Sequence, residues 1–154
     1  MSSGRSVSSK DPGAGGAPQG ITASHRLRLG AGDAHYGGGL VAGGRLMELL
    51  GDLATELCVA SDGDEGLLAA YHSVEFLLPV HAGDFIEVRG SITGAGRTSR
   101  RMELVVLRYA RPRADISDSA VDLLDEPEVV AKAGCTCVVG KDKQRRTESG
   151  QEME

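Results

Sequence analysis

Only one segment of this 154-residue sequence has the periodicity of a long helix, and the patterned segments around it alternate as strands do. Between Leu40 and Cys58, leucines recur every three or four residues, while charged side chains occupy the opposite side. A glycine-rich entry and the run Ser61-Asp62-Gly63-Asp64 mark the two ends. A single amphipathic helix has one apolar face to bury, so it requires a sheet to pack against.

The remaining pattern predicts that sheet. Segments with partial alternation and turn residues at their ends are expected to form strands at 21–29, 68–80, 84–92, 98–109 and 129–139. Residues 111–128 lie between the last two, and they are long for a hairpin connection, which usually takes about 2–5 residues. The order of one strand, a helix and three or four antiparallel strands predicts an α+β fold in which a sheet curls around one central helix.

Composition sets the limits of the folded part and its environment. Residues 1–20 contain five Ser, five Gly and two Pro, so we expect a disordered extension, followed by a domain at 21–140 and a polar tail at 141–154. The net charge of −5 argues against a general nucleic-acid binder, and no run approaches the roughly 20 apolar residues of a membrane span. Three cysteines and the lack of an apolar signal region predict a cytoplasmic protein without disulfides.

Two sets of motifs carry a resemblance to known families. PVHAGDFIEVRGSI (79–92) and GRTSRRM (96–102) are similar to segments of hot-dog fold acyl-CoA enzymes, the thioesterase superfamily. DAHYGGGLVAGGRLMELLGDLATEL (33–57), GDEGL (63–67) and RPRADISDSA (111–120) resemble the 3-aminobutyryl-CoA ammonia lyases of that superfamily. The likeness covers 22–143, and the acidic insertion favours the lyases because ordinary hot-dog thioesterases have a short connection there.

The resemblance implies a hot-dog domain, with an antiparallel sheet wrapped around one long central helix. It implies elimination of ammonia from a short 3-aminoacyl-CoA to give a 2-enoyl-CoA, as in lysine fermentation. Coenzyme A would be part of the substrate and no other cofactor is expected. It also implies a homodimer or higher homo-oligomer with sites at the subunit interface. The sequence departs from the family at Gly39 and Ala42, where Asn and Asp are usual.

The chemistry of such an elimination selects candidate residues. A base must remove the α-proton, donors must stabilise the enolate oxygen, and the leaving nitrogen must stay protonated. Asp33 in the glycine loop and Glu56 late on the helix are our candidates for an acid/base pair contributed by two neighbouring subunits. His35 and Tyr36 adjoin Asp33 as candidates for proton transfer and carbonyl orientation. The alternative for Asp33 is a turn residue, and for Glu56 a place in a solvated acidic stripe.

Two further groups of residues are expected to bind the thioester. Backbone amides of Gly38, Gly39 and Leu40, which we predict to open the helix, suit a developing oxyanion. By the resemblance, a basic strand start after a glycine turn binds the coenzyme phosphates; its members are Arg97, Thr98, Ser99, Arg100 and Arg101. The alternatives are a flexible loop and a merely solvated basic strand end.

Other chemistry has less support. Cys135 and Cys137 lack the spacing of a zinc site, so we expect them to be small buried residues. The sequence has no Ala-Ser-Gly triplet, which excludes a self-formed electrophilic ring, and Lys132 is the single lysine of the predicted domain. Two alternatives to the lyase remain open from the sequence: an acyl-CoA thioesterase and a non-catalytic acyl-CoA-binding module.

Overall fold

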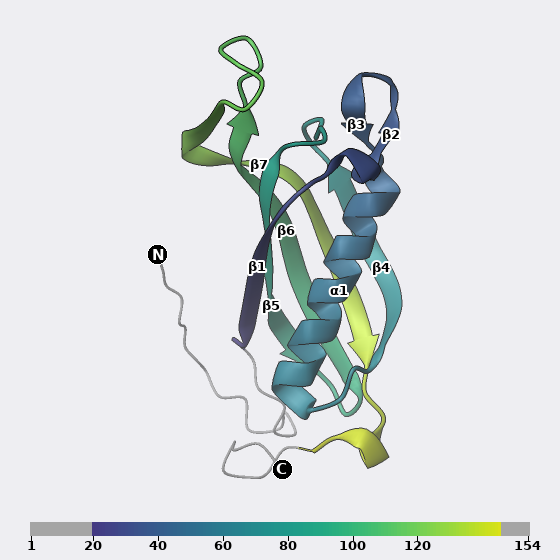
Figure 1. Ribbon diagram of the computed structural model, residues 1–154. Helices are drawn as coiled ribbons and strands as arrows, with labels where there is room; N and C mark the ends of the chain where they lie inside the picture. Colours follow the sequence, from purple (N-terminus) through teal and green to yellow (C-terminus); the bar gives the residue numbers. More distant parts are fainter. Residues whose placement is uncertain (1–19, 146–154) are drawn as a thin grey trace.

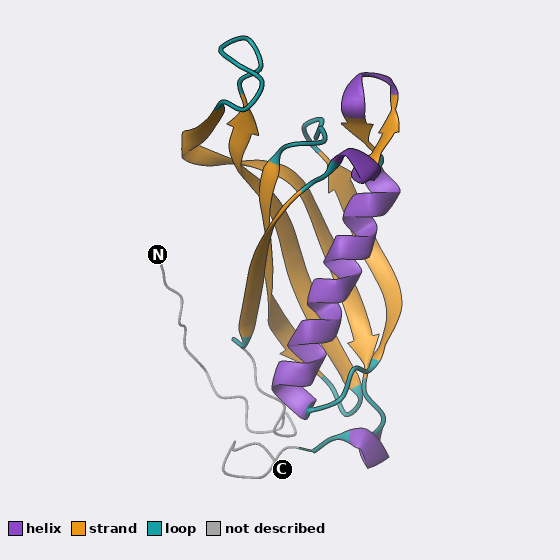
Figure 2. Cartoon of the chain, in the orientation of Figure 1, coloured by secondary structure: helices purple, strands orange, loops and turns teal. Residues whose placement is uncertain are grey.

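A computed structural model describes residues 20–145 of the chain and shows one long helix lying across one face of an antiparallel sheet (Figure 1). The sheet has five strands in the order β1-β5-β6-β7-β4. Their bounds are β1 Thr22–Arg28, β4 Leu67–Phe76, β5 Phe85–Ala95, β6 Ser99–Pro112 and β7 Val121–Val138. The helix, α1, spans Gly43–Asp62, and a separate two-stranded hairpin, β2 Ala34–Tyr36 and β3 Leu40–Val41, precedes it (Figure 2). The predicted hot-dog fold is confirmed.

The core lies between α1 and the inner face of the sheet. The leucines that set the helical period are buried, and Leu50, Leu53 and Leu57 are fully enclosed. Alternate residues of the central strands, such as Ile86 and Val106, face them. Because few aromatic residues contribute, the core consists mainly of Leu and Val side chains, with Ala, Cys, Ile and Met between them.

The helix begins later than the sequence pattern predicted, and it ends within Ser61-Asp62-Gly63-Asp64, the run predicted to stop it. Its first residue is Gly43 rather than Leu40, and a Cβ at that position would lie 2.8 Å from the Phe76 ring, so glycine lets β4 approach the helix closely. At the other end, α1 continues past Cys58 to Asp62 and stops at Gly63, whose φ of 71° suits a residue without a side chain.

The insertion at 111–128 differs most from its prediction. It is not a break between strands, because β6 and β7 extend into it and pair as far as Pro112 with Val121. Irregular pairing between Arg108 and Ala110 accommodates the extra residues of β7. The connecting loop, 113–120, is closed by Arg113, whose guanidinium pairs with Asp115 and Asp122 at 2.8 and 2.7 Å.

The first residues of the predicted polar tail contact the domain. Lys141–Lys143 form a 3-10 turn, and the Arg145 N–H donates to the Asp62 carbonyl at 3.0 Å. These contacts join residues 141–145 to the end of α1. The rest of the predicted tail, 146–154, and residues 1–19 of the predicted extension lie outside the described residues.

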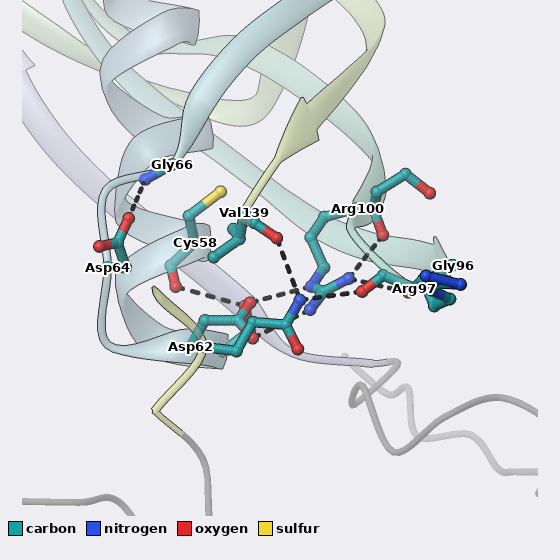
Figure 3. Close-up of polar contacts among 11 residues, drawn as sticks. Cys58, Asp62, Asp64, Gly66, Gly96, Arg97, Arg100 and Val139 are labelled. Carbon is teal, nitrogen blue, oxygen red and sulfur yellow. Dashed lines mark hydrogen bonds and ion pairs between the residues drawn. The ribbon is translucent and has the colours of Figure 1, made fainter. Parts of the chain in front are cut away.

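Two buried ion pairs join the elements at opposite ends of the sheet. Arg100 Nε and Nη2 lie 2.9 and 3.0 Å from the Asp62 carboxylate oxygens (Figure 3). Arg108 pairs with Asp84 at 3.0 Å and with Glu128 at 2.7 Å, and it also donates to the Pro79 carbonyl. Burying a charge is costly unless it is paired and hydrogen-bonded, and both arginines meet that condition.

Strand β4 forms one edge of the sheet and leaves apolar side chains exposed. Leu67 is 76% exposed, and Leu68, Phe76, Leu77 and Leu78 are 40–50% exposed. An edge strand with unpaired backbone groups and apolar side chains is a surface at which another strand can add.

Cys58, Cys135 and Cys137 are free and buried, which confirms the prediction for the latter two. The thiols are hydrogen-bonded to one another: donation from Cys137 to Cys135, together with burial, raises the pKa of Cys137 to about 12 and lowers the pKa of Cys135. Within residues 20–145, no helix is long and apolar enough to cross a membrane.

Candidate active site

The glycine loop folds into a small hairpin beside the N-terminus of α1. Gly38 and Gly39 have φ values of 74° and 79°, a conformation that L side chains rarely adopt, and they turn the chain between β2 and β3. The hairpin is attached to the turn after β4, because the Val41 N–H donates to the Val80 carbonyl and the Ala82 N–H to the Gly39 carbonyl, both at 2.8 Å. The loop is therefore fixed relative to the sheet.

Asp33 lies at the base of this hairpin, and each oxygen of its carboxylate accepts one hydrogen bond. Its Oδ2 accepts from the Gly30 N–H at 2.8 Å, and its Oδ1 accepts from Arg45 Nε at 2.7 Å. The Gly30 N–H and the Arg45 guanidinium hold the pKa of Asp33 below its usual value. Asp33 is therefore ionised at neutral pH, so it suits binding of a cation rather than donation of a proton.

His35 and Tyr36 lie on β2, and both side chains are accessible. Tyr36 is 55% exposed, and the two rings meet edge to face with centroids 4.6 Å apart. No hydrogen bond fixes either ring within residues 20–145. Both residues can therefore reach a molecule bound next to the hairpin.

The prediction that Gly38, Gly39 and Leu40 open the helix is wrong. Leu40 belongs to β3, and Ala42 is the N-cap residue before the first helical residue, Gly43, with no side-chain hydrogen bond to the helix. The free amides at the positive end of the helix dipole are therefore those of Gly43 and Gly44. The sequence signal for them was the Gly-Gly pair directly before the leucine period.

Glu56 lies far from Asp33 within one protomer. It follows Arg45, the partner of Asp33, by about three helical turns, or roughly 16 Å along the axis. Its side chain is 51% exposed, and its Oε1 lies 3.5 Å from His25 Nδ1 on β1. Glu48 and Asp52 are also exposed on α1, and Glu48 pairs with Arg45 at 3.2 Å.

The basic turn between β5 and β6 separates into accessible and buried members. Arg97 and Arg101 are exposed, and Thr98 and Ser99 are half-buried. Arg100 is only 1% exposed, and its guanidinium contacts Asp62 and the carbonyls of Gly96 and Ser99 (Figure 3). Arg100 is therefore a buried structural residue rather than the phosphate ligand that we expected.

The structure thus brings together Asp33, His35, Tyr36 and the start of α1, and it leaves Glu56 and the basic turn elsewhere on the same protomer. Two residues that contact these candidates were not predicted from the sequence. Arg45 sets the charge state of Asp33, and His25 contacts Glu56. An arginine at the start of a helix that follows an acidic loop residue was a sequence signal for the contact between Arg45 and Asp33. No local pattern indicated the contact between His25 and Glu56.

Other polar clusters lie away from these residues. A groove of about 860 Å³ on the outward-facing side of the sheet is lined by residues that include Glu75, Glu103 and Lys132, and by none of the predicted site residues. In the described part of the chain, no three His, Cys, Asp or Glu side chains are grouped as metal ligands.

Known proteins are similar to this chain in both sequence and fold. Residues 38–110 match the thioesterase superfamily. A 3-aminobutyryl-CoA ammonia lyase of Acetoanaerobium sticklandii is 58% identical over 121 residues, which are 79% of this chain and 96% of that protein. The chain belongs to the 3-aminobutyryl-CoA ammonia lyase family.

Solved structures extend the likeness to the fold of this family. A β-alanyl-CoA:ammonia lyase from Clostridium propionicum has 34% sequence identity and a TM-score of 0.79, and the match covers 86% of this chain and 95% of that one. A hexameric hot-dog fold thioesterase of Campylobacter jejuni has a TM-score of 0.64 at 18% identity, covering 84% and 86% of the two chains. The second match shows the shared fold alone.

Proposed function

We propose that this protein eliminates ammonia from 3-aminobutyryl-CoA to give crotonyl-CoA. The observation that carries the proposal is the 58% identity to a 3-aminobutyryl-CoA ammonia lyase across 96% of that protein's length. The likeness to a β-alanyl-CoA:ammonia lyase supports the same class of reaction on a 3-aminoacyl thioester.

The elimination balances with the substrate amine as an ammonium ion. A base removes the α-proton, the electrons of that C–H bond form the new C=C bond, and the C–N bond breaks with its electron pair on nitrogen, releasing NH₃. In our proposal Asp33, which is held ionised, binds the ammonium group next to His35 and Tyr36. The Gly43 and Gly44 amides face the thioester oxygen, where negative charge develops. These steps use side chains and backbone groups, so we propose that the enzyme needs no cofactor.

Glu56 is the proposed base, supplied by a second copy of the chain. We propose a homodimer that forms along the exposed apolar edge of β4. If two copies of β4 pair antiparallel, each α1 is reversed relative to the other, so the C-terminal half of one helix lies beside the N-terminal half of its neighbour. That arrangement moves Glu56 of one copy toward Asp33 of the other. Higher assemblies, such as the hexamer of the Campylobacter jejuni thioesterase, are compatible with this dimer.

The proposal is tested in the reverse direction. Purified protein is mixed with crotonyl-CoA and ammonium, and loss of the enoyl absorbance is followed alongside release of free thiol. Loss of absorbance without thiol release supports the lyase. Thiol release without amination would instead identify a thioesterase, the activity that gives the matching superfamily its name, and no change in either signal would leave an acyl-CoA-binding module.

A substitution separates the proposed base from its neighbours. Glu56→Gln keeps the size of the side chain but removes its basicity, so we expect amination to fall by at least about a hundredfold, the usual contribution of a general base. Asp52→Asn is the matched control, because Asp52 is an exposed carboxylate on the same helix. An equal loss in both variants would contradict a specific role for Glu56.

A further inference from the structure

In the turn between β5 and β6, four successive backbone carbonyls, those of residues 96–99, each accept a hydrogen bond from another part of the protein. Arg100 Nη1 donates to the Gly96 and Ser99 carbonyls at 3.1 and 2.7 Å. The Val139 N–H donates to the Thr98 carbonyl at 2.8 Å, and Gln144 Nε2 donates to the Arg97 carbonyl at 2.8 Å. Figure 3 shows the Arg100 contacts and the neighbouring end of β7.

This arrangement decides which groups of the turn face outward. In a trans peptide the N–H points opposite to the carbonyl, so inward carbonyls at Gly96 and Arg97 turn the N–H groups of Arg97 and Thr98 outward. Neither N–H donates to any group within residues 20–145. Two adjacent free amides next to the exposed Arg97 and Arg101 side chains make a set of donors that suits a phosphate.

Gln144 supplies the contact that comes from outside the sheet and helix. Its amide nitrogen bridges the Arg97 and Val139 carbonyls at 2.8 and 3.0 Å. The segment that carries it is held at both ends, because Lys141–Lys143 form a 3-10 turn and the Arg145 N–H donates to the Asp62 carbonyl. The Arg97 carbonyl receives no other donor in the described part of the chain.

We propose that Gln144 is a positioning residue for coenzyme A binding: it holds the Arg97 peptide so that the adjacent amide and guanidinium groups meet a phosphate of the coenzyme. The inference rests on the proposed function, because it takes this turn as the phosphate site. Gln144 is half-buried, whereas Val139, which carries its second acceptor, is fully buried. Thermal unfolding of each variant is therefore measured beside its kinetics, so that a loss of folded protein is not taken for a loss of binding.

The test compares two thioesters. Gln144→Met keeps the length of the side chain and removes both donors. We expect KM for crotonyl-CoA to rise roughly three- to tenfold, the equivalent of one or two lost hydrogen bonds, with kcat within about twofold. Crotonyl-pantetheine lacks the nucleotide and its phosphates, so its KM is expected to stay unchanged. Lys143→Gln, at an exposed neighbouring residue, is the control for loss of a surface charge in this segment.

The outcomes distinguish this inference from the proposed reaction. An equal rise in KM for both thioesters, an unchanged KM for crotonyl-CoA, or a rise of the same size in Lys143→Gln would overturn the role of Gln144. If the unmodified protein aminates neither thioester, calorimetric titration with coenzyme A and with pantetheine replaces the assay. Weakened binding of coenzyme A alone by Gln144→Met would then support the inference while the lyase proposal fails. Equal affinities of the variant and the parent for coenzyme A would overturn the role of Gln144.

Discussion

Arg45 Nε lies 2.7 Å from Asp33 Oδ1, so the first turn of α1 and the glycine loop before it are joined by a charged hydrogen bond. The Gly30 N–H binds the other carboxylate oxygen. Both contacts favour the ionised form, and together they outweigh the partial burial of Asp33, so its pKa is lowered. The contact fixes both the charge of the loop and its position relative to the helix.

Replacing Arg45 is therefore expected to change the acid side of the pH profile. Arg45→Gln removes the guanidinium, so the pKa of Asp33 rises toward its usual value and the acid limb of kcat/KM for 3-aminobutyryl-CoA moves to higher pH. Glu48→Gln removes the other partner of Arg45 and is the control, for which we expect little movement of that limb. An acid limb that stays in place in Arg45→Gln would show that ionised Asp33 is not required.

The same contact predicts how stability depends on pH. A carboxyl whose pKa is lower in the folded state stabilises the fold above its unfolded pKa, and this stabilisation is lost as pH falls through the folded pKa. The contribution of Asp33 is therefore present at neutral pH and declines below the ordinary value of 3.8. Urea unfolding at pH 7 and near pH 3 is expected to show a smaller difference between the two pH values for Arg45→Gln than for the parent. An unchanged difference would contradict the assignment.

The turn of the glycine loop gives a test of backbone conformation. Gly38 and Gly39 have positive φ, so an alanine at either position costs about 1–2 kcal/mol of folding free energy in the left-handed region. Gly37→Ala is the control, because its φ is not in that region and a Cβ there meets nothing within 4 Å. We expect thermal unfolding to shift down in Gly38→Ala and Gly39→Ala and to stay near the parent value in Gly37→Ala. Equal melting temperatures in all three would argue that the loop relaxes freely.

The fold followed from the sequence because its signals are local and consistent. One leucine period, a glycine on each side of it and alternating strands leave few ways to bury a single helix. The ends of the elements were less predictable, because tertiary contacts set them. Gly43 starts α1 where the Phe76 ring packs against it, and Val121 joins β7 because Pro112 lies opposite in β6.

The site was predicted in part, for a related reason. Asp33, His35 and Tyr36 lie together because they are neighbours in the chain, and a motif places them. Arg97, Arg100 and Arg101 look alike in sequence. Only Arg100 is buried, where it pairs with Asp62, nearly forty residues earlier in the chain. Only the packed structure shows which arginine pairs with a buried carboxylate.

The apolar edge of β4 predicts that assembly and activity are lost together. Leu67→Lys with Leu68→Lys places charges on an edge where we propose that a second copy pairs, so light scattering is expected to give the mass of one 16.0 kDa chain. Because the proposed site takes Glu56 from the second copy, amination is expected to fall with the dimer. Ile116→Ser, at an exposed apolar residue on the β6–β7 loop, is the control. A fully active monomer would contradict a shared site.

The Asp62–Arg100 pair separates stability from coenzyme binding. Both side chains are 2% exposed, so Arg100→Met removes a buried guanidinium that pairs with the Asp62 carboxylate, and it is expected to cost roughly 3–5 kcal/mol in urea unfolding. Arg101 is the next residue and is exposed. Arg101→Met is expected to keep the free energy of unfolding within about 0.5 kcal/mol of the parent value and to raise KM for the coenzyme A thioester. Replacing both members of the pair with Asp62→Leu and Arg100→Met is expected to recover much of the lost stability, because both buried charges of the pair are then removed. If Arg100→Met unfolds like the parent and only weakens coenzyme binding, then Arg100 is a phosphate ligand and its burial beside Asp62 does not persist in solution.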